Sequence, residues 1–416
     1  MKFFKITNFE ETHNGYVYKD GLNLLDKPFE PYGRCVQGGL YFTTLQYIHK
    51  FFDYGCYLRE IILPIDNLEF KMVEDPSGDK YRANMIILGK KYSLLDLTTY
   101  EMFGLSIYKN SVLMKKASEI GSIKTLEWAL KNGFSWNEKI CSSAASNGQL
   151  DTLKWVRENG CPWNLYTCSY AAKNGHLEVL KWARENGCRW SAITCSNAAL
   201  NGHLNVLKWA RDNGCTWDKH TCSNAALNGH LDILKWVREN GCTWDNTTCS
   251  NAALNGHLEV LQWARQNGCP WDTFVCNNAA MNGHLEVLKW ARENGCPWDT
   301  MTCSNAAKNN YLEVLQWARA NGCPWDAFTS SNAAQNGHLE ILQWVHKNGC
   351  PWNSHTCNMA ASYGNLEILI WIRENGCPWD SHTCYYAELF GNLKVLAWAR
   401  NNGCPYNNKQ KFLNIL

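Results

Sequence analysis

The chain has 416 residues, of which 45% are hydrophobic and 19% are charged, and its formal net charge at pH 7 is only +2. Because acidic and basic residues are nearly balanced, no strong field draws the chain onto nucleic acid or an anionic membrane. An apolar N-terminal leader and any run of about 18 apolar residues are also missing. We therefore expect a cytoplasmic protein with no nucleic-acid partner and no membrane partner.

Residues 1 to about 110 are not repetitive, and their β-branched, aromatic and turn residues predict a small α+β domain of unknown role. The expected elements are strands at residues 15–23, 38–44 and 57–64 and a helix at residues 45–55. Two further strands, 68–75 and 80–88, flank a turn-forming segment and are expected to pair as a hairpin. The domain is expected to end between Thr98 and Val112, where the pattern becomes helical.

The N-terminal region shows no spacing that defines a catalytic site. Its segment PYGRCVQGG contains a glycine pair, but no Lys-Ser or Lys-Thr follows, which argues against a nucleotide-binding loop. Arg34, Cys35 and His49 would form a site only if the fold brought them together. A pocket lined by Arg34, His49 and an acid would favour an enzyme, and the candidate acids are Asp53, Glu60 and Glu74.

From residue 111 to residue 416 the chain repeats one pattern, which residues 248–274 show as TCSNAALNGHLEVLQWARQNGCPWDTF. One tryptophan series recurs every 27 residues from Trp128 to Trp398, and a second follows it from Trp136 to Trp379. A fixed period of this length predicts a solenoid, here of eleven repeats, in which each unit buries its apolar face against its neighbours. The first and last units differ from the rest and are expected to be caps, sealed at the C-terminal end by Leu413, Ile415 and Leu416.

Each repeat is predicted to contain two helices. In the unit that begins at Thr167, this threonine is the expected N-cap of a first helix made narrow by an alanine pair. An Asn-Gly-His turn leads to an amphipathic second helix, and Gly187 is expected to end it in the left-handed conformation. The tryptophans are expected to form a structural ladder, with a platform that stacks carbohydrate or bases as the alternative.

Nineteen of the 21 cysteines fall into two columns of the repeat, as Cys161 and Cys168 do. Their separation of seven residues does not match the two to four residues typical of zinc knuckles. We therefore expect small, buried, reduced core residues, with metal binding and redox chemistry as the alternatives. The histidine column that includes His176 is expected to bond to the turns and not to a metal. No cofactor is expected.

The alanine pair, the Gly-His turn, the aliphatic second helix and the Gly-Cys end of this unit resemble the core of the ankyrin repeat, with cysteine in place of a final alanine. The period of 27 residues is shorter than the roughly 33 of that repeat, and Thr-Cys-Ser-Asn replaces its Thr-Pro-Leu-His opening. This Trp-rich variant, together with the N-terminal segment, is similar to the ankyrin-repeat proteins that giant DNA viruses of amoebae encode. The resemblance implies a mostly α protein, an ankyrin-like α-solenoid preceded by the α+β domain, that acts on host proteins in the host cytosol.

Because most positions of the repeat are nearly invariant, the variable positions indicate where a partner binds. The position after the alanine pair is apolar in four successive repeats, at Leu200, Leu227, Leu254 and Met281. The expected loop tip after Trp-Asp is apolar in three, at Phe274, Met301 and Phe328. In ankyrin stacks this edge forms the concave face, which predicts an apolar groove for a protein partner, of host origin if the chain is viral. Packing between repeats is the alternative role for both series.

These observations favour a non-enzymatic scaffold or adaptor for protein–protein interaction, for which no small-molecule substrate is expected. Two other classes of function remain open. The N-terminal domain could be an enzyme that the repeats deliver to its substrates, or the arrays could pack end to end in an assembly.

Overall fold

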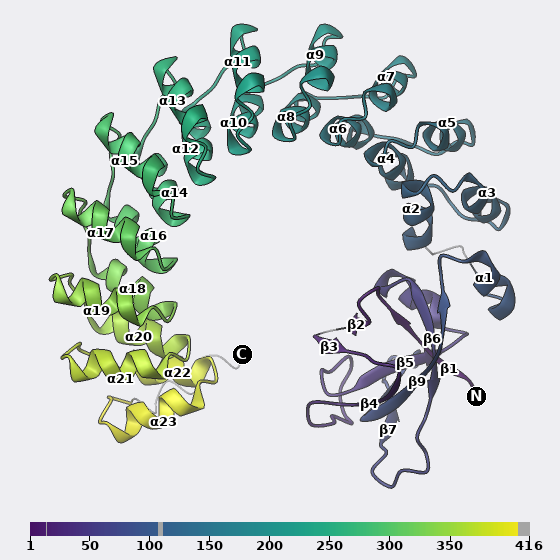
Figure 1. Ribbon diagram of the computed structural model, residues 1–416. Helices are drawn as coiled ribbons and strands as arrows, with labels where there is room; N and C mark the ends of the chain where they lie inside the picture. The colour runs from purple at the N-terminus through teal and green to yellow at the C-terminus, as the bar shows by residue number, and fades with distance from the viewer. Residues whose placement is uncertain (14, 107–110, 407–416) are drawn as a thin grey trace. The chain divides into compact units, whose positions relative to one another are not determined.

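The computed structural model describes residues 1–13, 15–106 and 111–406 (Figure 1). The chain divides into two compact units, Met1–Thr194 and Cys195–Leu416. The predicted division near residue 110 lies inside the first unit and stays a prediction. The expected seal formed by Leu413, Ile415 and Leu416 lies outside the described residues.

Antiparallel strands form the start of the first unit. They are β1 (Phe3–Thr7), β2 (Thr12–His13), β3 (Tyr16–Val17), β4 (Gly21–Leu24), β5 (Leu40–Thr44), β6 (Tyr57–Ile62), β7 (Met72–Glu74), β8 (Tyr81–Ala83) and β9 (Met85–Ser93). Within the described residues, seven of them form one sheet in the order β4-β9-β6-β1-β5-β8-β7, and β2 pairs with β3. A 3-10 helix, η1 (Ile48–Tyr54), and the helix α1 (Leu97–Phe103) complete this region.

The strands agree with the sequence-based expectations in most places but not all. The predicted hairpin is present, because Val73 of β7 pairs with Arg82 of β8. The helix expected at residues 45–55 is present as the shorter 3-10 helix η1, and the strand expected at residues 15–23 is divided between β3 and β4. Strand β1 was not predicted, although it lies inside the sheet between β5 and β6. Four consecutive residues of β1 are buried, so the strand shows no alternation of buried and exposed positions.

Paired helices of nine residues follow. The first helices of the repeats are α2 (Ser111–Glu119), α4 (Glu138–Ser146), α6 (Leu165–Lys173), α8 (Ala192–Leu200), α10 (Lys219–Leu227), α12 (Asn246–Leu254), α14 (Thr273–Met281), α16 (Thr300–Lys308), α18 (Ala327–Gln335), α20 (Ser354–Ser362) and α22 (Ser381–Leu389). The second helices are α3 (Ile123–Lys131), α5 (Leu150–Glu158), α7 (Leu177–Glu185), α9 (Leu204–Asp212), α11 (Leu231–Glu239), α13 (Leu258–Gln266), α15 (Leu285–Glu293), α17 (Leu312–Ala320), α19 (Leu339–Lys347), α21 (Leu366–Glu374) and α23 (Leu393–Asn401). The predicted ankyrin-like solenoid of helix-turn-helix repeats is confirmed.

The N-cap of the first helix is not the predicted threonine. In α6 the cap is Asn164, whose side chain accepts a hydrogen bond from the backbone N–H of Tyr166 at 3.0 Å, and Thr167 is fully buried inside the helix. Asp245 caps α12 in the same way. The residue that follows the loop tryptophan has extended backbone angles and a short side chain that reaches back to the helix, as a cap requires.

The second helix ends as predicted. Gly187 has a φ of +84°, in the left-handed region. The backbone N–H of Cys188 reaches back to the carbonyl of Ala183 at 2.9 Å, and the Asn186 side chain donates to the carbonyl of Trp182 at 2.8 Å. Together these bonds satisfy carbonyls that the end of a helix leaves unpaired.

The tryptophan ladder joins the two tryptophan series to each other. Trp271 of one loop meets Trp290 of the next repeat edge to face, with ring centroids 5.8 Å apart. The guanidinium of Arg265 lies 4.4 Å from the Trp271 centroid and donates to the carbonyl of Cys269 at 3.2 Å. The expected ladder of one series stacked repeat upon repeat is wrong, because the rings meet in pairs, each between a loop tryptophan and the second-helix tryptophan of the next repeat.

All cysteines except Cys35 are buried, and all are free thiols, as expected. A hydrogen bond with Cys269 and burial raise the pKa of the Cys249 thiol, which keeps it protonated in the core. Among the described residues, no group of three or more His, Cys, Asp and Glu side chains is placed to hold a metal ion.

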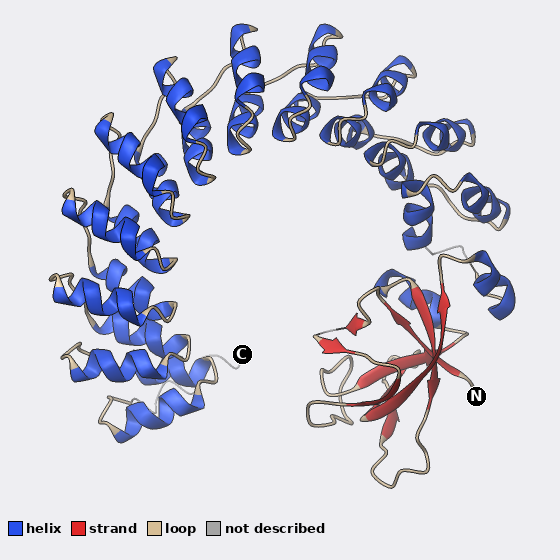
Figure 2. Ribbon diagram, in the orientation of Figure 1, coloured by secondary structure: helices blue, strands red, loops and turns tan. Residues whose placement is uncertain are grey.

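Within Cys195–Leu416, the first helices of successive repeats pack side by side, and the second helices lie behind them (Figures 1 and 2). The first helices α10 to α22 follow the inner side of the curve that this unit makes, and α11 to α23 follow its outer side. In the part of the chain that the structure describes, no helix is long and apolar enough to cross a bilayer.

Candidate protein-binding face

The two apolar series predicted from the sequence lie on the same side of the first helices. Phe274 is the second residue of α14 and Met281 is the ninth, so the two are seven residues apart. Seven residues make almost two full turns of an α-helix, which places both side chains on one side. Phe274, Met301 and Phe328 therefore belong to the first turn of a helix, and their predicted position at a loop tip is wrong.

The two series differ in exposure. Phe274 and Phe328 are each 60% exposed and Met301 is 52% exposed. The series at the other end of the helices is half-buried; it comprises Leu200, Leu227, Leu254 and Met281. The ring of Phe328 also meets the ring of His355 in the next repeat edge to face, at 5.9 Å. Neither series is buried in the core.

A row of asparagines lies between the two series, at the sixth position of the first helices α8 to α18. In five repeats of the second unit these are Asn224, Asn251, Asn278, Asn305 and Asn332. Each Nδ2 donates to a backbone carbonyl in the first helix of the preceding repeat; the bond from Asn278 to Ser250 is 3.1 Å long. Within the described residues their Oδ1 atoms accept no hydrogen bond.

This asparagine row was not predicted as a functional feature, although the sequence contains its signal. An asparagine stands directly before the alanine pair at a constant step of 27 residues. What could not be deduced is the direction of the side chain, whose Nδ2 crosses to the neighbouring helix. The row adds hydrogen-bond acceptors to an otherwise apolar face.

The backbone beneath the half-buried series is held by the following repeat. The carbonyl of Leu254 accepts from Asn282 Nδ2 at 2.8 Å, and it lies 3.2 Å from His284 Nε2. The expected turn-bonding role of the histidine column is confirmed, with the difference that each histidine bonds to the repeat before its own. Burial lowers the pKa of the neighbouring member of the column, His257, so the imidazole is neutral at pH 7.

The face carries no negative charge at its outward positions. From Lys219 to Gln335, the first, second, sixth and ninth residues of the first helices include no Asp or Glu. Carboxylates border the face as N-caps, where they are engaged; Asp245 caps α12 and pairs with Lys219 at 2.8 Å. The solvent-exposed side of these first helices is therefore apolar and weakly basic, with asparagine side chains along its middle.

Residues 1 to about 106 do not assemble the pocket that would have favoured an enzyme. Arg34 is exposed and His49 is half-buried, while Asp53 accepts a hydrogen bond from Ser111 at 3.0 Å. A cavity of about 150 Å³ is present in this domain, but neither Arg34, His49 nor any of the three candidate acids lines it. Of the residues singled out there, only Cys35 belongs to its wall.

Comparison with known proteins agrees with the fold. A family model described as "Ankyrin repeats (many copies)" matches residues 249–292. A protein of Acanthamoeba polyphaga mimivirus described as an ankyrin repeat protein is 47% identical over 135 residues, which are 31% of this chain and 67% of that protein. An uncharacterised protein of the same virus is 50% identical over 113 residues, 26% of this chain and 81% of that protein.

The structural comparison with the human ASB11 ankyrin repeat domain covers 38% of this chain and 84% of that domain, with 18% identity and a TM-score of 0.33. The repeat pattern, the helix pairs and the matched segments define an ankyrin-repeat solenoid. More specifically, the chain belongs to the family of mimivirus ankyrin repeat proteins.

Proposed function

We propose that this chain is a protein–protein interaction scaffold that binds its partner along the solvent-exposed side of the first helices α10 to α18. The supporting observation is the set of three exposed apolar side chains in adjacent repeats, Phe274, Met301 and Phe328, beside asparagine oxygens that accept no hydrogen bond. Large exposed apolar side chains that lie side by side are typical of surfaces that a partner covers. The half-buried leucines and Met281 form the other border of the same face.

The chemistry of the face limits the partner. Apolar anchors call for an apolar segment, and free amide oxygens call for hydrogen-bond donors between the anchors. Because the outward positions carry no acid, the partner does not need a strongly basic segment. An extended segment of a host protein, with apolar side chains on one side and free backbone N–H groups, meets these requirements.

We place this interaction in the cytoplasm of the host cell. The repeats contain many free thiols in pairs, such as Cys249 and Cys269. Free cysteines persist in reducing compartments and become oxidised in secretory ones. Mimivirus relatives support a host partner, because a viral protein made in an amoeba meets amoebal proteins.

The test is affinity capture from amoeba lysate with the full chain and with a triple variant, Phe274→Glu, Met301→Glu and Phe328→Glu. The three charges stand where the partner's apolar side chains would be buried, so the captured protein should be lost while the helical circular dichroism signal stays unchanged. A matched control places three glutamates on exposed glutamines of the second helices, at Gln266, Gln316 and Gln343. Equal capture by the wild-type chain and the triple variant, or equal loss in the control, would contradict the proposal.

A further inference from the structure

The cavity in the N-terminal region is lined by basic side chains and by no acidic side chain. Most of its lining is apolar or aromatic, with Phe4, Phe42, Phe51, Tyr41 and Tyr54 among its residues. Its ionisable nitrogen groups are Lys5, His13 and Lys80, and neither aspartate nor glutamate lines it. A pocket that combines an aromatic body with cationic groups is complementary to a small anion with an apolar body.

Lys5 is the buried cation of this pocket. Its side chain lies on β1 and the residue is only 4% exposed. Its Nζ donates to the carbonyl of Tyr41 at 2.9 Å, lies 3.5 Å from His13 Nδ1, and stands 4.5 Å from the ring centroid of Tyr18. These partners are neutral, so the ammonium has hydrogen bonds but lacks a counter-ion.

Glu11 is the acid whose charge acts on Lys5, but its carboxylate forms ion pairs with other cations. Lys5 pairs across the sheet with Arg59 of β6, and Arg59 lies 3.5 Å from Glu11 and also contacts Asp20. Lys91 of β9 lies 3.5 Å from the same carboxylate. Two other cations thus share Glu11, and among the described residues no carboxylate forms an ion pair with Lys5.

This environment changes the titration of both groups in the pocket. Burial lowers the pKa of Lys5 to about 7, and the charge of Glu11 opposes the shift only in part. Burial, together with the charge of Lys5, lowers the pKa of His13 to about 4. At neutral pH the imidazole is therefore uncharged, and the amine is divided between its two forms.

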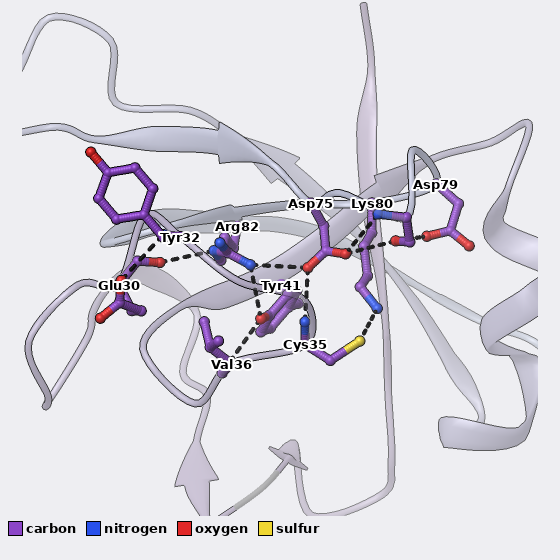
Figure 3. A network of polar contacts seen from close by, with 10 residues as sticks. Glu30, Tyr32, Cys35, Val36, Tyr41, Asp75, Asp79, Lys80 and Arg82 are labelled. Atoms are coloured by element: carbon purple, nitrogen blue, oxygen red, sulfur yellow. Dashed lines mark hydrogen bonds and ion pairs between the residues drawn. The ribbon is translucent and has the colours of Figure 1, made fainter.

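Lys80 carries the second amine that lines the cavity. Lys80 Nζ lies 3.0 Å from Cys35 Sγ and 5.5 Å from the ring centroid of Tyr41 (Figure 3). Asp75 holds the segment that carries Cys35. Its carboxylate accepts hydrogen bonds from the Cys35 backbone N–H at 3.1 Å and from Arg82 at 3.0 Å. Tyr41 thus contacts both amines, with Lys5 at its carbonyl and Lys80 over its ring.

We propose that this cavity binds a small monocarboxylate with an apolar, flat body of about the size of benzoate, whose carboxylate pairs with Lys5 and faces Lys80. The aromatic side chains of the lining receive the body of the ligand. The carboxylate supplies the counter-ion that Lys5 lacks, which makes the ligand a part of the charge balance of the site. Such a site would make the N-terminal domain a sensor or carrier module, separate from the protein-binding face.

The experiment is titration calorimetry on the full chain with benzoate, and with benzamide as the neutral ligand of the same shape. Benzoate should bind and benzamide should bind at least about tenfold more weakly, the difference expected for a charged hydrogen bond. Since the ligand stabilises the protonated amine, binding near pH 8 should take up close to one proton, measured in buffers of different ionisation enthalpy. The affinity should fall as the pH rises above about 7.

Variants separate the site from other lysines. Lys5→Met should lose both the binding and the proton uptake, Lys80→Met should weaken binding, and Lys2→Met, which removes an exposed lysine nearby, should change neither. If Lys5→Met fails to fold, the proton uptake of the wild-type chain still decides the question. No binding of benzoate, equal binding of benzamide, or binding without proton uptake would overturn the proposal.

Discussion

The N-terminal sheet and the repeats bury polar groups in opposite ways. In the sheet, Lys5, Arg59, Asp75 and Arg82 are all buried, and each has contacts that occur once in the molecule. In the described part of the repeats, the buried polar residues are uncharged serines, threonines and asparagines, most of them at positions that recur every 27 residues. The sheet therefore depends on single charge balances, whereas the repeats distribute their stability over many equivalent contacts. Removing one partner of a buried charge in the sheet should therefore cause a large loss of stability, whereas removing one contact in the repeats should destabilise only the neighbouring repeats.

The largest effect is expected for Asp75→Asn. Asp75 and Arg82 are 3.0 Å apart and their side chains are fully buried, so the substitution leaves the guanidinium charge without a partner. We expect a loss of about 3 to 5 kcal/mol of stability, measured by urea unfolding with hydrogen exchange of β5 and β8. The control is Lys50→Met, which removes an exposed ion pair with Asp79 and should cost at most about 1 kcal/mol. Equal effects of the two substitutions would remove the contrast between buried and exposed pairs.

Lys5→Met is expected to stabilise the sheet, in a pH-dependent manner. The pKa of Lys5 is about 7 in the folded chain and near 10.5 in the unfolded chain, so between these values unfolding takes up a proton. The stability of the wild-type chain relative to Lys5→Met should therefore rise with pH, by at most about 1.4 kcal/mol per unit. Below about pH 7 the difference should be constant. A flat profile up to pH 10 would show that Lys5 keeps its proton in the folded chain.

In the repeats, Ala253→Leu is expected to cost about 1 to 3 kcal/mol, because the alanine is fully buried where two first helices pack closely. Hydrogen exchange should become faster in α10, α12 and α14 and stay unchanged in α20 and α22. Leu254→Ala, at the next position but half-buried, is the matched comparison and should cost less. Uniform acceleration along the unit would contradict the idea that contacts are local.

Asp272→Ala should cost about 1 kcal/mol by removing an N-cap. Asp272 accepts from the backbone N–H of Phe274 at 3.0 Å, and Asn246 donates to its second oxygen. Asp272→Asn should retain most of the stability, since Asn164 and Asn353 cap the equivalent helices. Thermal unfolding of both variants measures the difference, and a loss of the same size in Asp272→Asn would mean that the charge matters more than the cap.

The smallest effect is expected for Cys249→Ser, at most about 1 kcal/mol. The chain itself carries a serine in this column, Ser330, whose hydroxyl donates to the carbonyl of Pro351 at 3.0 Å and to Cys350 Sγ at 3.4 Å. We expect a serine hydroxyl at residue 249 to donate to the carbonyl of Pro270, which is equivalent to Pro351 and belongs to the same repeat as residue 249. Urea unfolding should therefore give nearly the wild-type midpoint, and a large loss would show that the thiol pair itself is needed.

The repeats were largely predictable because their signal is repeated. The period, the helix pairs and the glycine that ends each second helix follow from the spacing of Trp, Ala-Ala and Asn-Gly. The start of the first helix could not be predicted in this way, since Thr167 and Asn164 are both good caps by residue type and only the backbone angles distinguish them. The side of the helix that carries Phe274 followed once that start was known.

The sheet was less predictable for a physical reason. Strand β1 holds Lys5 in its buried segment, and a lysine among apolar residues is usually an exposed position. Its burial depends on Tyr41 and His13, which lie 36 and 8 residues further along the chain. No local pattern reports such contacts, so the strand and the cavity beside it were both missed.

The contacts between repeats have a consequence for how such a chain can change in length. Asn278 reaches back 28 residues to Ser250, His284 reaches back 30 to Leu254, and Trp290 lies 19 residues beyond Trp271. If one period of 27 residues were duplicated or deleted by recombination, every donor in the middle of the array would find the same kind of acceptor again. The gene can therefore lengthen or shorten the binding face in whole steps, and alter its outward side chains separately, without a new packing solution at each step.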